Sequence, residues 1–199
     1  MYLKEATVRR RGIASALGWG DAETALAFKV LPQIMRSRFD IFLSHAVRDA
    51  ELVLGLKEIL EATGRIVYID WIDDPALDRS HVSGKTAEVL RKRMRESESL
   101  LYLHTRHSRV SRWMPWELGF FDGLNGNVAI MPVIPDNGRL DFEQEEFLQI
   151  YPKIDVVDVT GTPSLHVNRA RRTEGGDYLP FDAWLKSPDK LRPDFGPGQ

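Results

Sequence analysis

The residues with the clearest chemical potential lie close together at Trp113, Pro115 and Glu117. Proline fits the first turn of a helix, because its missing N–H has no partner there in any case. Glu117 is then expected in that first turn, where the positive end of the helix dipole favours an ionised carboxylate. Trp113 lies four residues before Glu117, close enough to border the same pocket. One ionised carboxylate beside an aromatic ring suits the stabilisation of positive charge that develops during a reaction.

The same residues also fit an ordinary structural role. A glutamate in a first turn is commonly favoured by the helix dipole alone, and tryptophans at helix starts commonly anchor a hydrophobic core. Trp116, which precedes Glu117, is expected to point either into the core or to the rim of the pocket. The cluster by itself leaves both interpretations open, so the elements around it have to be considered.

The middle of the chain alternates between short apolar runs, typical of buried strands, and longer segments with helical periodicity. We expect strands at residues 39–44, 66–71, 100–104, 128–134 and 154–159, and helices over 49–64, 83–94, 116–124 and 143–150. Asp49 is expected to cap the first of these helices. Alternation of this kind predicts an α/β fold in which helices cover both faces of a parallel sheet. Ligands of such sheets bind at the carboxyl ends of the strands. The segments to inspect are therefore 44–49, 71–85, 105–117 and 135–138.

Four motifs, in this order, resemble those of the TIR (Toll/interleukin-1 receptor) domain family. Residues 39–45, FDIFLSH, resemble box 1, and residues 68–70, YID, resemble the second TIR strand. Residues 83–85, SGK, resemble the end of the loop after that strand, and residues 113–117, WMPWE, match the WxxxE motif of catalytic members. The resemblance covers residues 38–159, about 60% of the chain. The layout is most similar to prokaryotic TIR proteins, including the TIR component of Thoeris antiphage defence.

The resemblance implies a flavodoxin-like fold of three layers around a central five-stranded parallel sheet. It also implies NAD⁺ glycohydrolase or ADP-ribosyl cyclase activity, with the WxxxE glutamate, Glu117, as the catalytic residue. NAD⁺ is then the substrate, and no separate cofactor is expected. The expected substrate-binding residues, from the motif and the loops after the strands, are Trp113, Phe42, Ser44, His45, Arg48, Trp71, Asp74, Lys85 and Trp116.

Cleavage of NAD⁺ suits a site with a single acidic group. The nicotinamide departs as a neutral molecule, so it needs no acid, unlike the leaving group of an ordinary glycoside. Glu117 can stabilise the oxocarbenium-like transition state, and Trp113 can stack on the pyridinium for about 0.5–2 kcal/mol. Capture of the cation by water gives ADP-ribose. Capture by an adenine nitrogen or a ribose hydroxyl gives a cyclic isomer, and the sequence leaves both outcomes open.

Two other functions compete with this enzyme hypothesis. One is a non-catalytic adaptor that binds other TIR domains, and the other is an enzyme similar to nucleoside deoxyribosyltransferases, which also place one glutamate at a ribosyl carbon. We favour the NAD⁺-cleaving enzyme in antiphage defence, because Trp113 and Glu117 are both present together with box 1. The family resemblance also implies a homo-oligomer formed through TIR–TIR contacts.

Composition narrows the remaining choices. The chain has 199 residues, no cysteine and a net charge of −2, and it contains no apolar run of the roughly 20 residues that span a bilayer. We therefore expect a cytoplasmic protein without nucleic-acid or membrane partners. His104 and His107 have HxxH spacing but no carboxylate at a matching offset, so no metal site is expected. The expected divisions are a helical extension at 1–37, the TIR domain at 38–160 and a Pro-rich extension at 161–199.

Overall fold

The computed structural model describes residues 2–30, 35–69, 84–138, 145–159, 161–169 and 178–191. Its strands form one sheet in the order β3-β2-β4-β5-β6-β7-β8, and β1 pairs with β5 outside this path. The strands are β1 (Leu3–Lys4), β2 (Phe39–Ser44), β3 (Val67–Tyr68), β4 (Ser97–His104), β5 (Val128–Ile134), β6 (Lys153–Val159), β7 (Thr162–Asn168) and β8 (Tyr178–Pro180).

Five neighbouring strands, from β3 to β6, run parallel. Numbered along the chain, these five have the order 2-1-3-4-5 of flavodoxin-like sheets. The chain reverses its direction of travel across the sheet between β2 and β4, which makes this pair the topological switch point. The expected fold is confirmed, and β7 and β8 add an antiparallel margin beyond β6.

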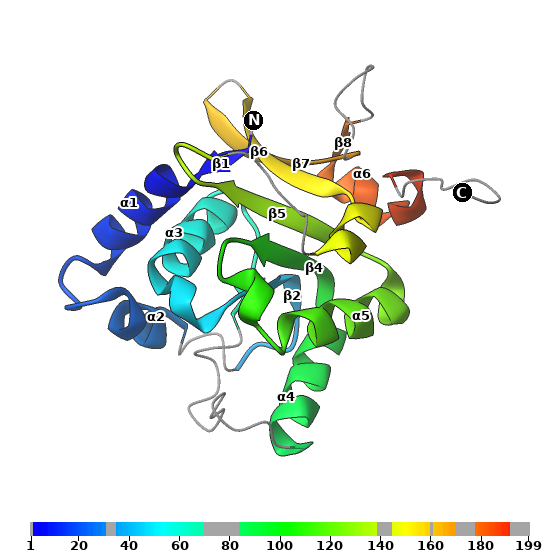
Figure 1. Ribbon diagram of the computed structural model, residues 1–199, viewed down its shortest axis with the longest axis horizontal. Coiled ribbons are helices and arrows are strands. Elements are labelled where there is room, and N and C mark those ends of the chain that lie inside the picture. The colour runs from blue at the N-terminus through cyan, green and yellow to red at the C-terminus, as the bar shows by residue number, and fades with distance from the viewer. Residues whose placement is uncertain are drawn as a thin grey trace.

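Helices cover both faces of the sheet, as Figure 1 shows. The α-helices are α1 (Glu5–Ala16), α2 (Ala22–Val30), α3 (Ala50–Glu61), α4 (Gly84–Arg95), α5 (Met114–Asn125) and α6 (Phe181–Leu185). The 3₁₀ helices are η2 (Val47–Asp49), η3 (Ser108–Val110), η4 (Glu146–Ile150) and η5 (Pro188–Leu191). None of the described helices combines the length and the apolar character needed to cross a membrane.

Alternating side chains of the strands divide the interior into two hydrophobic cores. Leu43 of β2 and Leu101 of β4 point to one face, where they pack with residues of α1, α2, α3 and α6. Phe42 and Tyr102, the neighbours of these leucines along the strands, point to the opposite face under α4 and α5. Polar residues at the carboxyl end of this second face are therefore held against a rigid apolar base.

The ends of α5 follow from local sequence. Pro115 lies in the first turn of α5, where an unpaired N–H would otherwise be exposed. Gly126 ends the helix in the left-handed conformation, with a φ of 73°, which an L side chain rarely adopts. Trp113 O accepts the Glu117 N–H at 2.9 Å, so the helix begins within the WxxxE segment.

Three predicted elements differ from the structure or lie partly beyond its description. The strand expected at residues 66–71 is observed as β3 over Val67–Tyr68, and residues 70 and 71 are outside the described residues. The helix expected at 143–150 is a 3₁₀ helix over Glu146–Ile150, with residues 143 and 144 outside the description. Asp49 precedes α3 as expected, but its side chain makes no capping bond to that helix.

Candidate active site

The carboxylate of Glu117 lies at the topological switch point. Ser44 ends β2, and its hydroxyl donates a hydrogen bond of 2.5 Å to Glu117 Oε2. In the sheet Ser44 is in register with Tyr102 of β4, the strand across the switch point. Glu117 comes from the first turn of α5, which packs on this face of the sheet. The sequence-predicted catalytic residue is thus at the carboxyl edge where an α/β sheet binds ligands.

Glu117 and Ser44 are both fully buried. A buried carboxylate needs hydrogen-bond donors, since an unsolvated charge is otherwise very costly. The hydroxyl of Ser44 supplies one such donor, and the amino-terminal end of α5 supplies a favourable dipole. Full burial shields Glu117 from water, and electrostatic interactions are stronger in such a low-dielectric environment.

A second buried carboxylate, Asp49, joins the end of β2 to the end of β4. Thr105 Oγ1 donates to Asp49 Oδ2 at 2.6 Å, and His107 Nδ1 lies 2.6 Å from Asp49 Oδ1. Asp49 is 1% exposed. The residue expected to cap α3 instead ties together the two loops that flank the switch point.

A third carboxylate, Glu145, lies in the same region from a different part of the chain. Tyr102 donates its hydroxyl to Glu145 Oε1 at 2.8 Å, and His104 Nε2 lies 3.2 Å from Glu145 Oε2. Burial acts to raise the pKa of Glu145, but hydrogen bonds from His104 and Tyr102 outweigh it and hold that pKa below its ordinary value. Burial, and then the charge of Glu145, raise the pKa of Tyr102, which therefore stays protonated.

The two histidines of the HxxH spacing thus contact different carboxylates, His104 with Glu145 and His107 with Asp49. They do not converge on a common point through these contacts. Among the residues that the structure describes, no group of three or more His, Cys, Asp or Glu side chains is arranged to hold a metal ion.

The tryptophans of the WxxxE segment form an aromatic rim along α5. Trp113 and Trp116 meet edge to face with ring centroids 5.4 Å apart, and Trp116 stacks on Phe120 at 5.8 Å. Arg91 of α4 lies over the Trp116 ring at 5.8 Å. Trp116 therefore packs between α4 and α5, at the partly exposed rim and not in the interior of the core.

The structure gathers some of the predicted binding residues and does not describe others. Ser44 contacts Glu117, His45 is buried with Nδ1 2.9 Å from Leu43 O, and Phe42 packs on Tyr68 beneath them. Arg48 is exposed in η2. Trp71 and Asp74 lie outside the described residues, and for Lys85 the structure describes only the backbone, in the first turn of α4.

The sequence did not identify Tyr102, Asp49 or Glu145 as members of the group of buried polar residues at the carboxyl ends of β2 and β4. Tyr102 looks like one more aromatic residue of a buried strand. Asp49 and Glu145 precede helical segments, where an acidic residue has an ordinary local explanation. Their partners are 37 to 58 residues away along the chain, so no local pattern could reveal them.

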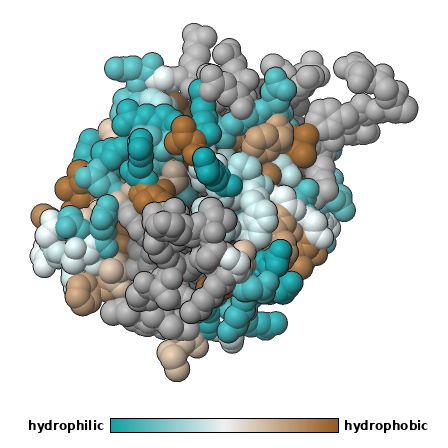
Figure 2. All heavy atoms as spheres, turned by 60° about the horizontal axis from the view of Figure 1, so that its bottom comes forward, coloured by the Kyte–Doolittle hydropathy of each residue, from teal (hydrophilic) through white to brown (hydrophobic). Residues whose placement is uncertain are grey.

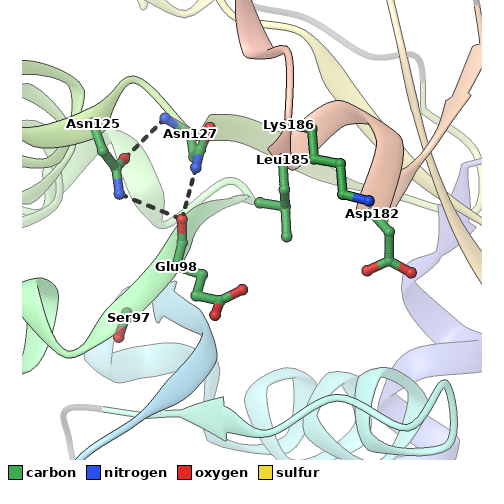
Figure 3. Close-up of a pocket in the computed structure, with 7 residues that line it drawn as sticks. All are labelled: Ser97, Glu98, Asn125, Asn127, Asp182, Leu185 and Lys186. Atoms are coloured by element: carbon green, nitrogen blue, oxygen red, sulfur yellow. Dashed lines mark hydrogen bonds between the residues drawn. The ribbon is translucent and has the colours of Figure 1, made fainter.

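A cavity of about 560 Å³ lies at the other end of the sheet. Its lining comes from the starts of β4 and β5, the end of α5, and α6, as Figure 3 shows, and consists of Ser97, Glu98, Asn125, Asn127, Asp182, Leu185 and Lys186. Asn125 and Asn127 both donate their side-chain amides to the backbone oxygen of Glu98. The cavity is therefore separate from the Glu117 region, because it opens at the amino ends of the same strands.

Fold and site together define an α/β protein of the flavodoxin-like type with a buried glutamate at its switch point. Residues 41–169 match the TIR domain family, a stretch longer than half of the 199-residue chain. The chain belongs to the TIR domain family.

Two similar proteins carry names that refer to the synthesis of a cyclic ADP-D-ribose. A protein of Bacillus cereus (strain MSX-D12), named "Probable 3' cyclic ADP-D-ribose synthase ThsB'", is 47% identical over 116 residues, which cover 58% of this chain and 60% of that protein. A protein of Cytobacillus dafuensis, named "Putative cyclic ADP-D-ribose synthase TIR2", is 33% identical over 86 residues, covering 41% of this chain and 22% of that protein. The matches therefore span less than two thirds of either relative.

Proposed function

We propose that this protein cleaves the nicotinamide–ribose bond of NAD⁺ and releases nicotinamide together with a cyclic ADP-ribose isomer or ADP-ribose. The observation that carries the proposal is the buried Ser44–Glu117 hydrogen bond at the switch point of a TIR domain. The names of the two similar proteins support a cyclic product.

The chemistry can be assigned to the residues of the site. The bond between the ribosyl carbon and the pyridinium nitrogen breaks, the nitrogen keeps the electron pair, and nicotinamide leaves as a neutral molecule. Ser44 orients the Glu117 carboxylate, whose negative charge stabilises the oxocarbenium-like transition state. Trp113, whose backbone oxygen accepts the Glu117 N–H, supplies the aromatic ring that stacks on the cationic pyridinium.

Burial of Glu117 bears on the fate of the ribosyl cation. A site that excludes water favours capture by a group of the substrate itself, an adenine nitrogen or a ribose hydroxyl. A hydroxyl that attacks forms the new carbon–oxygen bond and passes its proton to the Glu117 carboxylate, the base at this site. Hydrolysis requires water in the same place, so the ratio of cyclic to linear product measures how well the site is closed.

Further parts of the proposal concern the whole protein. Phe42, Ser44, His45, Arg48, Trp71, Asp74, Lys85, Trp113 and Trp116 bind the substrate, with Glu117 as the catalytic residue. NAD⁺ is a substrate and no separate cofactor takes part. The protein acts in the cytoplasm in antiphage defence, as a homo-oligomer through TIR–TIR contacts.

The test is incubation of the purified protein with NAD⁺, followed by chromatography and mass spectrometry of nicotinamide and nucleotide products. Glu117→Gln should lose at least about 100-fold in kcat, because the charge that stabilises the transition state is removed. Glu146→Gln is the matched control, since Glu146 is exposed in η4. The measurement is repeated over a range of protein concentrations to reveal any dependence on self-association.

Three results would contradict the proposal. Wild-type protein that binds another TIR domain but never turns over NAD⁺ would indicate an adaptor. Exchange of bases on deoxynucleosides without NAD⁺ cleavage would indicate a deoxyribosyltransferase. Full activity of a folded Glu117→Gln variant would show that the catalytic residue is elsewhere.

A further inference from the structure

Glu145 is a buried carboxylate, 4% exposed, that contacts two parts of the chain at once. Its Oε1 accepts the Tyr102 hydroxyl from β4. Its Oε2 accepts the Ser108 hydroxyl at 3.3 Å from η3 and lies 4.0 Å from Arg109 Nε, in addition to the contact with His104.

These contacts surround the connection that places the WxxxE segment. The carboxyl end of β4 contributes Tyr102 and His104, and η3, four residues after β4 ends, contributes Ser108. The single hydroxyl hydrogen of Ser108 is shared between Glu145 Oε2 and Thr105 O, and the contact to Thr105 O, at 2.8 Å, is the shorter and closes the turn on itself. Three residues separate η3 from α5, so an anchor on η3 limits where Trp113 and Glu117 can lie.

Tyr102 connects Glu145 to the catalytic region by a second route. It is in register with Ser44, the donor to Glu117. The charges of both Glu145 and, more weakly, Glu117 raise the pKa of its hydroxyl, so this single phenol lies within the field of both carboxylates. Loss of the Tyr102–Glu145 hydrogen bond would leave a buried polar group unsatisfied. The bond therefore holds both side chains, and with them the end of β4, in place.

We propose that Glu145 is a positioning residue for the reaction at Glu117: through Tyr102, His104 and Ser108 it fixes the end of β4 and the turn into α5. The inference rests on the proposed NAD⁺-cleaving function. Glu145 acts on the geometry of Glu117 and not on the substrate, so its loss affects the chemical step more than substrate binding.

The experiment is a double-mutant cycle on the full chain, made of Glu145→Gln, Tyr102→Phe and the combined variant, with Glu146→Gln as control. The kcat should fall about 10-fold in each single variant, while KM changes less than about 3-fold. The kcat of the combined variant should be only slightly lower than that of either single variant, because both changes remove the same Tyr102–Glu145 hydrogen bond. Thermal unfolding of each variant confirms that the protein is folded.

Tyr102→Phe keeps the test valid if Glu145→Gln fails to fold, because it removes one hydroxyl from a ring that stays packed. Wild-type kcat in folded Tyr102→Phe, multiplicative losses in the combined variant, or a change in KM alone would each overturn the positioning role. A wild-type protein that releases no nicotinamide contradicts the proposed function, and the positioning role with it. An active wild type with unaffected variants contradicts only the role of Glu145.

Discussion

Three buried carboxylates at the carboxyl edge of the sheet, Asp49, Glu117 and Glu145, have different hydrogen-bond partners. Asp49 and Glu145 are each held by donors from β4 and the loop after it, whereas Glu117 accepts the hydroxyl of Ser44 from β2. Each buried charge needs such partners to offset the cost of leaving water. Because the hydroxyl of Ser44 donates to Glu117, replacing Ser44 can alter the site while the hydrogen bonds of Asp49 and Glu145 stay in place.

Ser44→Ala should lower kcat for nicotinamide release by about 10- to 100-fold. A hydrogen bond to a charged group is worth about 1.5–3 kcal/mol, and each 1.4 kcal/mol in the barrier is about tenfold in rate. Steady-state kinetics measures the effect. Ser164→Ala on β7, beyond the parallel strands, is the control and should behave as wild type. A kcat for Ser44→Ala within about twofold of wild type would show that this hydroxyl does not serve catalysis.

Lys153, at the start of β6, should give the protein a pH-dependent stability. Burial lowers the pKa of Lys153 to about 8, whereas the unfolded chain has a pKa of about 10.4. Between these values the unfolded state binds more protons, so stability rises with pH from about 8 to 10. The melting temperature of wild type minus that of Lys153→Met should therefore increase over this window. A difference that stays flat, or falls, would contradict the lowered pKa.

Among the elements, α1 and α3 pack closely against each other at two glycines. A Cβ atom on Gly55 would lie 2.0 Å from Val8 O, and one on Gly12 would lie 1.9 Å from Glu51 O. Both contacts are with backbone, which cannot move aside without shifting a helix. The absence of these side chains therefore lets the amino-terminal helix lie flush on the TIR core.

Gly55→Ala should destabilise the protein by about 1–3 kcal/mol, the usual cost of overpacking. Gly119→Ala in α5 is the matched control, because a Cβ there meets no atom within 4 Å. This second change should stabilise the protein by up to about 1 kcal/mol through helix propensity alone. Urea unfolding measures both, and equal midpoints for the two variants would show that α1 is not held against α3.

The five parallel strands and their helices could be predicted because their apolar runs are local and periodic. β1 and β7 could not, for particular reasons. β1 has only two residues, and β7 begins Thr162-Pro163, next to a Pro-rich tail that favours a loop. Both depend on pairing with a strand already in place. The same limit applies to the site, where Glu117 belongs to a motif but Glu145 gains its role only through distant partners.

At the scale of the whole molecule, one of the two hydrophobic cores joins both ends of the described chain to the parallel strands. Val8 of α1, Phe181 and Trp184 of α6, and Leu191 of η5 all lie in the core that contains Ile41 of β2. On the face in Figure 2, by contrast, hydrophobic residues occur as separate patches among hydrophilic ones. The helical segments outside residues 38–160 thus contribute side chains to the same core as the parallel strands.

Substitutions of Trp184 test whether α6 contributes to the core that contains the parallel strands. Trp184 is fully buried, and its indole N–H has no hydrogen-bond partner among the residues described. Trp184→Ala should cost about 3–5 kcal/mol of unfolding free energy by leaving a cavity. Trp184→Phe should cost less, because it keeps an aromatic ring and removes the unsatisfied donor.

Trp19→Ala is the matched control for Trp184, since Trp19 is 41% exposed between α1 and α2 and should matter little to stability. Chemical denaturation compares the three variants. Where Trp184→Phe remains folded, its kcat should equal that of wild type, because α6 lies near the amino ends of the strands whereas Glu117 lies at their carboxyl ends. Equal stability of Trp184→Ala and Trp19→Ala would mean that α6 merely rests on the TIR fold, whereas a large difference makes residues 178–191 part of what holds the sheet together.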